Sequence, residues 1–211
     1  LDGLRDRADV RVIYTGSAAE YGSGSRLLED GAPTPGTVFG AAKAAASIIT
    51  QTYSRLYQMQ TVVLRLFTPY GPWEHPRRLI PHTILSALGG EDVRLSNGQQ
   101  RRDYFYIDDA VEALVLAATA PVSPGTTLNI CSGSGIKVQA VVQLVLKLMG
   151  HPVRAVVGAL PTRSDEIWES SGDNSAARRV LGWSPKIRLE DGLRRSIAWI
   201  TENRELVGSL T

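Results

Sequence analysis

The chain has 211 residues, a formal net charge of +2 and 43% hydrophobic residues. This length can bury the core of one large or two small domains, and so small a net charge, with scattered basic residues, excludes a nucleic-acid partner recognised by bulk electrostatics. The single cysteine, Cys131, excludes an internal disulfide framework, and no apolar run approaches a membrane span, so we expect a cytoplasmic protein that does not enter a membrane.

Two β-rich runs, at residues 10–14 and 61–66, enclose a long segment with helical period. This pattern predicts a strand, helix, strand unit. Thr37 is the expected N-cap of the helix, since it follows Pro-Gly and precedes the periodic residues. Four residues mark the predicted apolar face of this helix, namely Ala45, Ile49, Tyr53 and Leu56.

Further elements continue the alternation. We predict helices over 79–88, 108–119, 138–149 and 192–199, and a strand over 127–130. Asp108 or Asp109 is expected to cap its helix, and residues 181–183, Leu-Gly-Trp, to close another against a second lobe. The alternation predicts an α/β fold with a doubly wound parallel sheet, whose ligands bind at the carboxyl ends of the strands.

The chain is expected to cross between two structural units. Residues 1–71 and 106–133 are assigned to the parallel sheet, and residues 72–105 and 134–211 to a smaller lobe that faces the sheet edge.

Two segments could contribute chemistry. Residues 15–22, Thr-Gly-Ser-Ala-Ala-Glu-Tyr-Gly, follow the first predicted strand, and residues 39–43, Phe-Gly-Ala-Ala-Lys, have the frame of a Tyr-x-x-x-Lys motif without the phenol oxygen. Phe39 and Lys43 are four residues apart and share a helix face. A free phenol has a pKa of about 10, so a tyrosine needs a nearby ammonium before it can accept a proton at neutral pH.

These segments resemble the extended short-chain dehydrogenases/reductases that act on nucleotide sugars, the NAD-dependent epimerase/dehydratase family. The resemblance implies a partial Rossmann-like fold with a smaller α/β substrate-binding lobe, NAD or NADP as cofactor and a nucleotide sugar as substrate. Ser17 matches the residue that orients the reacting sugar oxygen. Lys43 matches the lysine that holds the nicotinamide ribose, and Phe39 occupies the position of the catalytic tyrosine.

Phe39 leaves several interpretations open. A deliberate Tyr-to-Phe substitution would hold ligand without turnover, and a naturally silent or repurposed protein is the second interpretation. The third is an enzyme that uses another acid: Tyr21, Tyr70 or a water held by Ser17. Taken alone, residues 39–43 also fit a core phenylalanine on an alanine-rich helix.

Residues 65–72, Arg-Leu-Phe-Thr-Pro-Tyr-Gly-Pro, resemble the family's Arg-x-Phe-Asn-x-x-Gly-Pro segment. The resemblance implies that Leu66 and Phe67 line the nicotinamide, and we assign Thr15 to the cofactor as well. Thr68 replaces the asparagine that contacts the sugar nucleotide and is assigned to the substrate, as is Tyr21. Taken alone, the segment also fits a Pro-Gly turn that ends a strand.

The basic residues supply candidates for substrate binding. Arg78 and Leu79 resemble the start of the family's substrate lobe, and Arg102 lies in a segment, residues 98–104, that resembles its Gly-x-x-x-Arg-Asp-Tyr motif. Arg102, and Arg163 as a second such arginine, match residues that clamp the nucleotide diphosphate. A planar guanidinium suits that role because it can donate two charge-assisted hydrogen bonds to phosphate.

The subclass follows from Ala18 and Ala19, which stand where 4,6-dehydratases of the family have acidic residues. Without a carboxylate, elimination of water lacks its general acid and base. The predicted function is therefore an NAD(P)-dependent 4-ketoreductase or epimerase acting at C4 of an NDP-hexose, inactive or impaired because of Phe39. The alternative is a catalytically silent sugar-nucleotide-binding protein.

The sequence contains no Gly-x-x-Gly-x-x-Gly loop, so we expect the family's N-terminal third, which cradles the dinucleotide phosphates, to be missing. The choice between NAD and NADP and the identity of the sugar stay open. The dispersed histidines predict no metal site. The resemblance implies a homodimer formed through the helix that contains residues 39–43.

Overall fold

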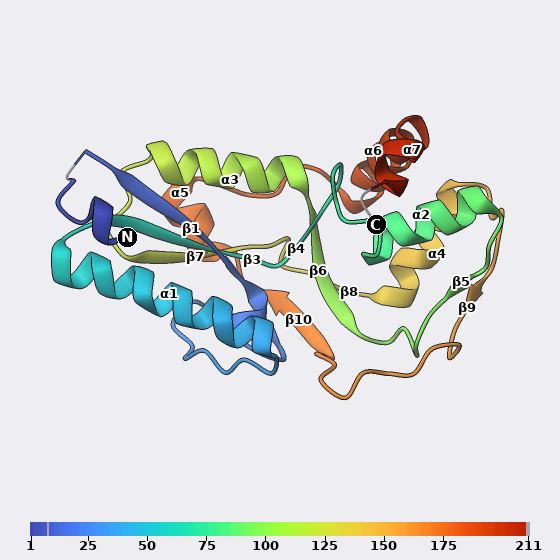
Figure 1. Cartoon of the computed structure of the whole chain (residues 1–211), viewed down its shortest axis with the longest axis horizontal. Helices are drawn as coiled ribbons and strands as arrows, with labels where there is room; N and C mark the ends of the chain where they lie inside the picture. Colours follow the sequence, from blue (N-terminus) through green and yellow to red (C-terminus); the bar gives the residue numbers. More distant parts are fainter. Residues whose placement is uncertain (8, 210–211) are drawn as a thin grey trace.

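The computed structural model describes residues 1–7 and 9–209, and its elements fall into two parts along the long axis of the molecule (Figure 1). The first part is a parallel sheet in the order β1-β3-β7, formed by β1 (Arg11–Ser17), β3 (Gln60–Leu66) and β7 (Thr126–Ile130). Helices α1 (Val38–Tyr57) and α3 (Ile107–Thr119) cover opposite faces of this sheet (Figure 1). The predicted doubly wound α/β fold is confirmed.

The second part contains the sheet β2-β10-β6-β4, with β8 antiparallel to β6, and a separate pair of strands, β5 and β9. Helices α2, α4 and α6 pack against one another beside it. The bounds are β2 (Gly24–Leu27), β4 (Thr68–Tyr70), α2 (Leu79–Gly89), β5 (Val93–Arg94), β6 (Arg101–Tyr106), β8 (Gly135–Lys137), α4 (Val138–Leu148), β9 (Ala155–Val156), β10 (Glu169–Gly172), α6 (Leu189–Glu202) and α7 (Arg204–Gly208).

The central strand β3 is buried from residue 61 to residue 65, with three consecutive apolar residues at 62–64, as expected for a parallel strand covered on both faces. β1 extends to Ser17, beyond the predicted end at residue 14, because its pairing with β3 continues until Ser17 lies opposite Leu66. Both strands therefore end at the same level, next to the second part of the molecule.

Helix α1 begins as predicted, since the Thr37 side chain accepts a hydrogen bond from the Gly40 N–H at 3.0 Å. The apolar face predicted for α1 does not pack on the sheet, since Ile49 is 53% exposed and Leu56 is 68% exposed. The face that packs on the sheet consists of small residues, Gly40, Ala44, Ser47, Thr50 and Ser54. Because α1 lies close to the sheet, only small side chains fit between them. The periodicity of apolar residues in the sequence does not reveal that size limit.

The expected cap of α3 is also wrong. Tyr106 is the N-cap residue, and no side chain bonds to the exposed N–H groups there. Asp109 is buried and accepts hydrogen bonds from the backbone N–H groups of Lys186 and Ile187, at 3.0 and 3.2 Å. Asp108 forms an exposed ion pair with Arg195 instead. Asp109 thus fixes a distant loop rather than its own helix.

Helix α5 (Ser175–Leu181) ends at Gly182, whose φ of 65° is left-handed, as residues 181–183 predict. The following Trp183 is buried and packs edge-on against Phe105, in the same core as α3 and β7. Residues 134–211 were assigned to the smaller lobe as a whole, and α5 departs from that assignment because it packs on β7.

Candidate active site

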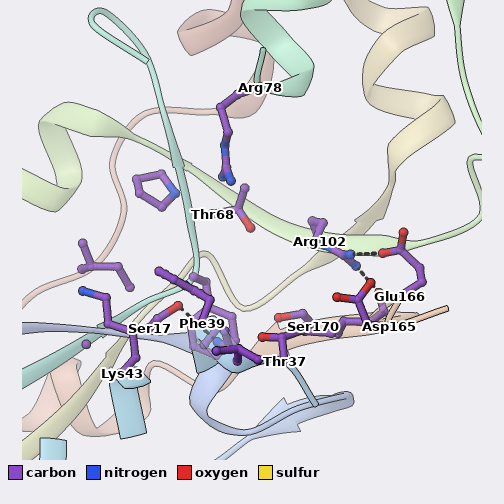
Figure 2. Close-up of a pocket in the computed structure, with 18 of the residues that line it drawn as sticks. Ser17, Thr37, Phe39, Lys43, Thr68, Arg78, Arg102, Asp165, Glu166 and Ser170 are labelled. Carbon is purple, nitrogen blue, oxygen red and sulfur yellow. Dashed lines mark hydrogen bonds and ion pairs between the residues drawn. The ribbon is translucent and has the colours of Figure 1, made fainter. Parts of the chain in front are cut away.

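A cavity of about 660 Å³ lies beyond the carboxyl ends of β1 and β3, where they face the second part of the molecule (Figure 2). This is the expected position for a ligand in an open parallel sheet. Most of the residues assigned to the site from the sequence line it, namely Thr15, Ser17, Phe39, Lys43, Leu66, Phe67, Thr68, Arg78, Arg102 and Arg163.

Ser17 ends β1 and begins a short 3₁₀ turn, residues 18–20. Its hydroxyl oxygen accepts a hydrogen bond from the Ala19 N–H at 3.2 Å, while the carboxylate of Glu20 accepts one from the Ser17 N–H at 2.8 Å. This reciprocal capping box fixes both the backbone and the side chain of Ser17. Since the hydroxyl oxygen already accepts a bond, its own proton can be donated to a ligand in the cavity.

Glu20 is itself held by a buried ion pair with Arg65 on β3, with 2.8 Å between Nε and Oε2. The two side chains are 0% and 4% exposed. The Arg65 guanidinium also lies 4.5 Å from the centre of the Tyr21 ring. The turn that contains Ser17 is therefore anchored to the central strand of the sheet.

Lys43 reaches the end of β1 from α1, and its ammonium donates a hydrogen bond to the backbone oxygen of Thr15 at 2.8 Å. The same ammonium lies 5.3 Å from the centre of the Tyr14 ring and 6.0 Å from the centre of the Phe39 ring. Phe39 is 60% exposed, so it is a cavity residue and not a core phenylalanine. The frame of the Tyr-x-x-x-Lys motif is preserved, and a ring without an oxygen faces the lysine.

The end of β3 supplies the opposite wall through Leu66, Phe67 and Thr68. The Phe67 N–H donates to the backbone oxygen of Ile130 at 3.1 Å, which carries the pairing with β7 past the end of β3. Gly172 on β10 packs directly on the Phe67 ring, since a Cβ there would lie 2.5 Å from the ring. This contact joins the end of β3 to β10 next to a residue that lines the cavity, Phe67.

The two arginines assigned to a diphosphate are both paired with carboxylates. Arg102 donates to Glu166 at 2.6 Å and to the backbone oxygen of Ile167 at 2.5 Å. Arg163 donates through two nitrogens to Asp165, at 3.0 and 2.9 Å. Figure 2 shows Arg102 pointing toward the segment that contains Asp165 and Glu166. An anionic ligand would therefore compete with these carboxylates for both guanidinium groups.

Two residues assigned to the substrate, Tyr21 and Leu79, do not line the cavity. Tyr21 is buried, its hydroxyl donates to Asn129 at 2.8 Å, and burial raises its pKa to about 12. Tyr70 is buried too, and its hydroxyl donates to the backbone oxygen of Leu189 at 3.0 Å. Neither phenol is placed to replace the oxygen missing at Phe39.

Further lining residues were not assigned to the site from the sequence: Gly16, Ala18, Ala19, Thr37, Val38, Pro69, Asp165, Glu166, Ile167 and Ser170. Ala18, Ala19, Thr37 and Val38 flank assigned residues, so chain proximity was an available signal. Asp165 and Glu166 lie two and three positions after Arg163, which was a second signal that they line the cavity. Ile167 and Ser170 come from β10 and the loop before it, and nothing local in the sequence links them to β1 or β3.

In residues 1–7 and 9–209 no cluster of histidine, cysteine, aspartate and glutamate has the arrangement of a metal site. Across the same residues, no helix combines the length and hydropathy required to cross a bilayer.

The fold and the cavity define an α/β protein of the Rossmann type, with a ligand site between the parallel sheet and a smaller lobe. The chain belongs to the NAD dependent epimerase/dehydratase family, whose family model matches residues 1–131.

The UDP-glucuronate 4-epimerase of Thermodesulfobacterium geofontis (strain OPF15) is 27% identical over 205 residues, which cover 96% of this chain and 61% of that protein. The dTDP-glucose 4,6-dehydratase DesIV from Streptomyces venezuelae, solved with NAD and TYD bound, is 25% identical with a TM-score of 0.90, covering 100% of this chain and 66% of that one.

A third similar structure is a tyrosine-to-phenylalanine mutant of the UDP-glucuronic acid 4-epimerase from Bacillus cereus. It was solved in complex with UDP-4-deoxy-4-fluoro-glucuronic acid and NAD, and it has 25% identity and a TM-score of 0.89, covering 95% of this chain and 64% of that one. The chain spans less than two-thirds of the length of the curated relatives it matches, for example 65%, 62% and 63% of three of them.

Proposed function

We propose that the chain is part of an NAD(P)-dependent nucleotide-sugar oxidoreductase, of 4-ketoreductase or epimerase type, that acts at C4 of an NDP-hexose and is impaired at the proton-transfer step by Phe39. One observation carries this proposal: a single cavity unites Ser17, the helix end with Phe39 and Lys43, and three arginines. The similarity to epimerases and dehydratases of nucleotide sugars supports the substrate class.

The donor set suits the nicotinamide end of a dinucleotide. The Lys43 ammonium donates one hydrogen bond to Thr15 and has further protons available for ribose hydroxyls, while Leu66 and Phe67 offer apolar surface to a planar ring. A bound NAD(P) would supply hydride transfer to or from the sugar carbon. The sequence has no glycine-rich loop for the pyrophosphate, so we assign to this chain the nicotinamide end alone.

The roles of the remaining residues follow from their bonds. Ser17 would donate its hydroxyl proton to the reacting sugar oxygen, because its oxygen already accepts from Ala19. Thr68 would contact the sugar. Arg102 and Arg163 would bind the diphosphate after exchanging their carboxylate partners for phosphate oxygens.

A ketoreductase or epimerase is favoured over a dehydratase. Ala18 and Ala19 line the cavity without a carboxylate, and the neighbouring Glu20 is buried in its pair with Arg65. The acids that do line the cavity, Asp165 and Glu166, are both paired with arginines. Both acids therefore lie with the arginines assigned to the diphosphate, and Ala18 and Ala19 offer no carboxylate beside Ser17 to act as general acid or base in an elimination.

A second candidate is a catalytically silent sugar-nucleotide-binding protein of the same fold. The observation that favours it is that no tyrosine of the described residues lines the cavity: Phe39 has no hydroxyl, and the hydroxyls of Tyr21 and Tyr70 are engaged elsewhere. Such a protein would keep the cavity for sensing or for pairing with an active partner.

Phe39→Tyr separates the two functions. Because a tyrosine here faces the Lys43 ammonium, we expect turnover to rise about 10²- to 10⁴-fold. The measurement, made on the full-length protein that includes this chain, is the oxidation of NADH or NADPH with an NDP-4-keto-hexose, with Phe39→Leu as the matched control. Tight nucleotide-sugar binding without turnover in Phe39→Tyr would sink the enzyme proposal and favour the silent binder.

We also propose a homodimer formed through α1. Its outward face is apolar and exposed, and among its residues Ile48, Ile49 and Leu56 are 50%, 53% and 68% exposed. A second copy of this helix is a matching occupant, because a two-fold axis would place the same apolar surface opposite itself.

A further inference from the structure

Arg78 differs from the other cations of the cavity. Lys43, Arg102 and Arg163 donate to the oxygen of Thr15 or to carboxylates at normal hydrogen-bond distances. Arg78 bonds through Nε alone, to Glu74 at a long 3.4 Å, and its side chain is 59% exposed. Among the described residues, neither terminal nitrogen of Arg78 has a hydrogen-bond partner. Its guanidinium points toward Thr68 in the cavity (Figure 2).

Glu74, the partner of Arg78, is largely buried and incompletely satisfied. Its side chain is 14% exposed, and its second oxygen, Oε2, is buried with no hydrogen-bond partner in the part of the chain that the structure describes. A turn holds it in place: the Glu74 N–H donates to the Gly71 oxygen at 3.3 Å, and Trp73 before it has a left-handed φ of 67°. A carboxylate that is both buried and half-satisfied is unfavourable.

We propose that Arg78 is a contact for an anionic group of the ligand, either a phosphate or a carboxylate on the sugar, and that Glu74 regulates this contact through its own charge. The inference rests on the proposed function, since it takes the ligand of the cavity to be a nucleotide sugar. A guanidinium with both terminal nitrogens free can bind such a group through two hydrogen bonds.

The titration of Glu74 gives this regulation its direction. Burial raises the pKa of Glu74 to about 7, against the opposing influence of Arg78. Below that pH the carboxyl is neutral and Arg78 presents a full positive charge to the cavity. Above it, the Glu74 carboxylate neutralises Arg78. An anion bound at Arg78 disfavours the carboxylate further, so binding takes up a proton and is tighter at low pH.

The effect of Glu74 on the pH dependence of binding must be distinguished from the effects of the groups around it. Arg78 faces it from the start of α2. On β6, burial raises the pKa of Tyr104, and the charges of Arg102, Glu74 and Arg78 also act on that phenol. α6 contributes the uncharged ring of Trp199, which packs against Trp73 with the ring planes tilted by 54°. A histidine can also change its charge near pH 7, so pH dependence alone does not identify Glu74 as its cause. Variants of Glu74 are needed to make that identification.

Calorimetric titration of the protein with UDP- and dTDP-glucose, whose charge is on the diphosphate, and with UDP-glucuronate, which adds a carboxylate, tests the proposal. If binding raises the pKa of Glu74 by about half a unit to one unit, affinity at about pH 6 is about two- to fivefold higher than at about pH 8. Glu74→Gln is expected to bind at the higher pH as tightly as the unchanged protein does at the lower one. Arg78→Met is expected to weaken binding at both.

Arg77→Met is the matched control, because Arg77 is exposed and does not line the cavity. An Arg78→Met loss confined to UDP-glucuronate identifies the anion as the sugar carboxylate, and an equal loss for the glucose forms identifies it as the diphosphate. Sugar-nucleotide binding that is indifferent to both Arg78→Met and Glu74→Gln overturns the subsite and leaves the proposed function standing.

Inorganic sulfate, whose charge is constant in this pH range, tests the Arg78 subsite independently of nucleotide-sugar binding. If no nucleotide sugar binds but sulfate raises the melting temperature, and Arg78→Met abolishes that rise, the subsite stands and the proposed function fails. If sulfate raises the melting temperature equally in Arg78→Met and in the unchanged protein, the free guanidinium is not the anion contact and the inference is wrong.

Discussion

The hydroxyl of Ser17 depends on a residue outside the cavity. Glu20 accepts the Ser17 N–H with one oxygen and the Arg65 Nε–H with the other, both at 2.8 Å. Removing one charge of a buried pair is more damaging than losing an exposed ion pair, because the remaining charge has no compensation. The Glu20–Arg65 pair therefore fixes the position of Ser17.

Glu20→Gln is expected to lower the free energy of unfolding by about 2–4 kcal/mol, because Arg65 stays buried without its anion. Urea denaturation followed by circular dichroism measures this, with the midpoint falling and the slope unchanged. Glu112→Gln, which disrupts the exposed pair with Lys186, is the control and should cost less than about 1 kcal/mol. Equal effects of the two substitutions would mean that the Glu20 pair is hydrated.

Glu74 makes stability depend on pH. Its pKa in the folded protein is about 7, above the ordinary 4.5, so the folded state binds the proton more tightly than the unfolded one. The stability that the neutral carboxyl contributes is fully present below about pH 4.5 and is lost as pH rises to about 7. Glu74→Gln is expected to raise the melting temperature at about pH 8 and to change it little at about pH 4. An increase of equal size at both pH values would contradict the assignment.

At the scale of elements, α1 has two unlike faces. Small residues face the sheet and larger apolar ones face outward. Gly40 sets the approach of the helix to the turn after β1, because a Cβ at Gly40 would collide with the backbone oxygen of Ala19. The same approach brings Phe39 and Lys43 to the end of β1.

Gly40→Ala has two opposing effects on the stability of the protein. Helix propensity alone would stabilise the protein by about 1 kcal/mol, whereas the collision with backbone costs about 1–3 kcal/mol. We expect net destabilisation, seen as a lower melting temperature. Gly36→Ala is the control, since nothing lies within 4 Å of a Cβ at that position, and it should be close to neutral. A more stable Gly40→Ala would show that α1 can move away from the turn.

At the scale of the whole molecule, the outward face of α1 is the surface proposed for the dimer. Ile49→Asp places a charge in that face and is expected to shift the protein to a monomer in size-exclusion chromatography with light scattering. Val115→Asp, on the exposed face of α3, is the matched control and should leave the mass unchanged, since Val115 is 56% exposed. A monomeric unchanged protein would refute the proposed dimer.

The sequence by itself determined the alternation of strands and helices, the start of α1 at Thr37, and the residues that meet at the strand ends. These features depend on spacing over a few residues and on the rule that parallel strands bring their carboxyl ends to one edge. Ser17, Phe39, Lys43 and Thr68 could be assigned to one site before their contacts were known, because the motifs that contain them resemble those of the family.

Only the tertiary structure decided which face of α1 is buried, that Arg102 is paired with Glu166, and that Glu74 is enclosed while the terminal nitrogens of Arg78 have no partner among the described residues. The Arg102 and Glu166 side chains meet across 64 positions of the sequence. Close packing sets such contacts, and it admits a residue by its size and by whether its polar atoms find partners. The periodicity of the sequence indicates which side chains are polar, but it does not indicate which sizes fit or which polar atoms find partners.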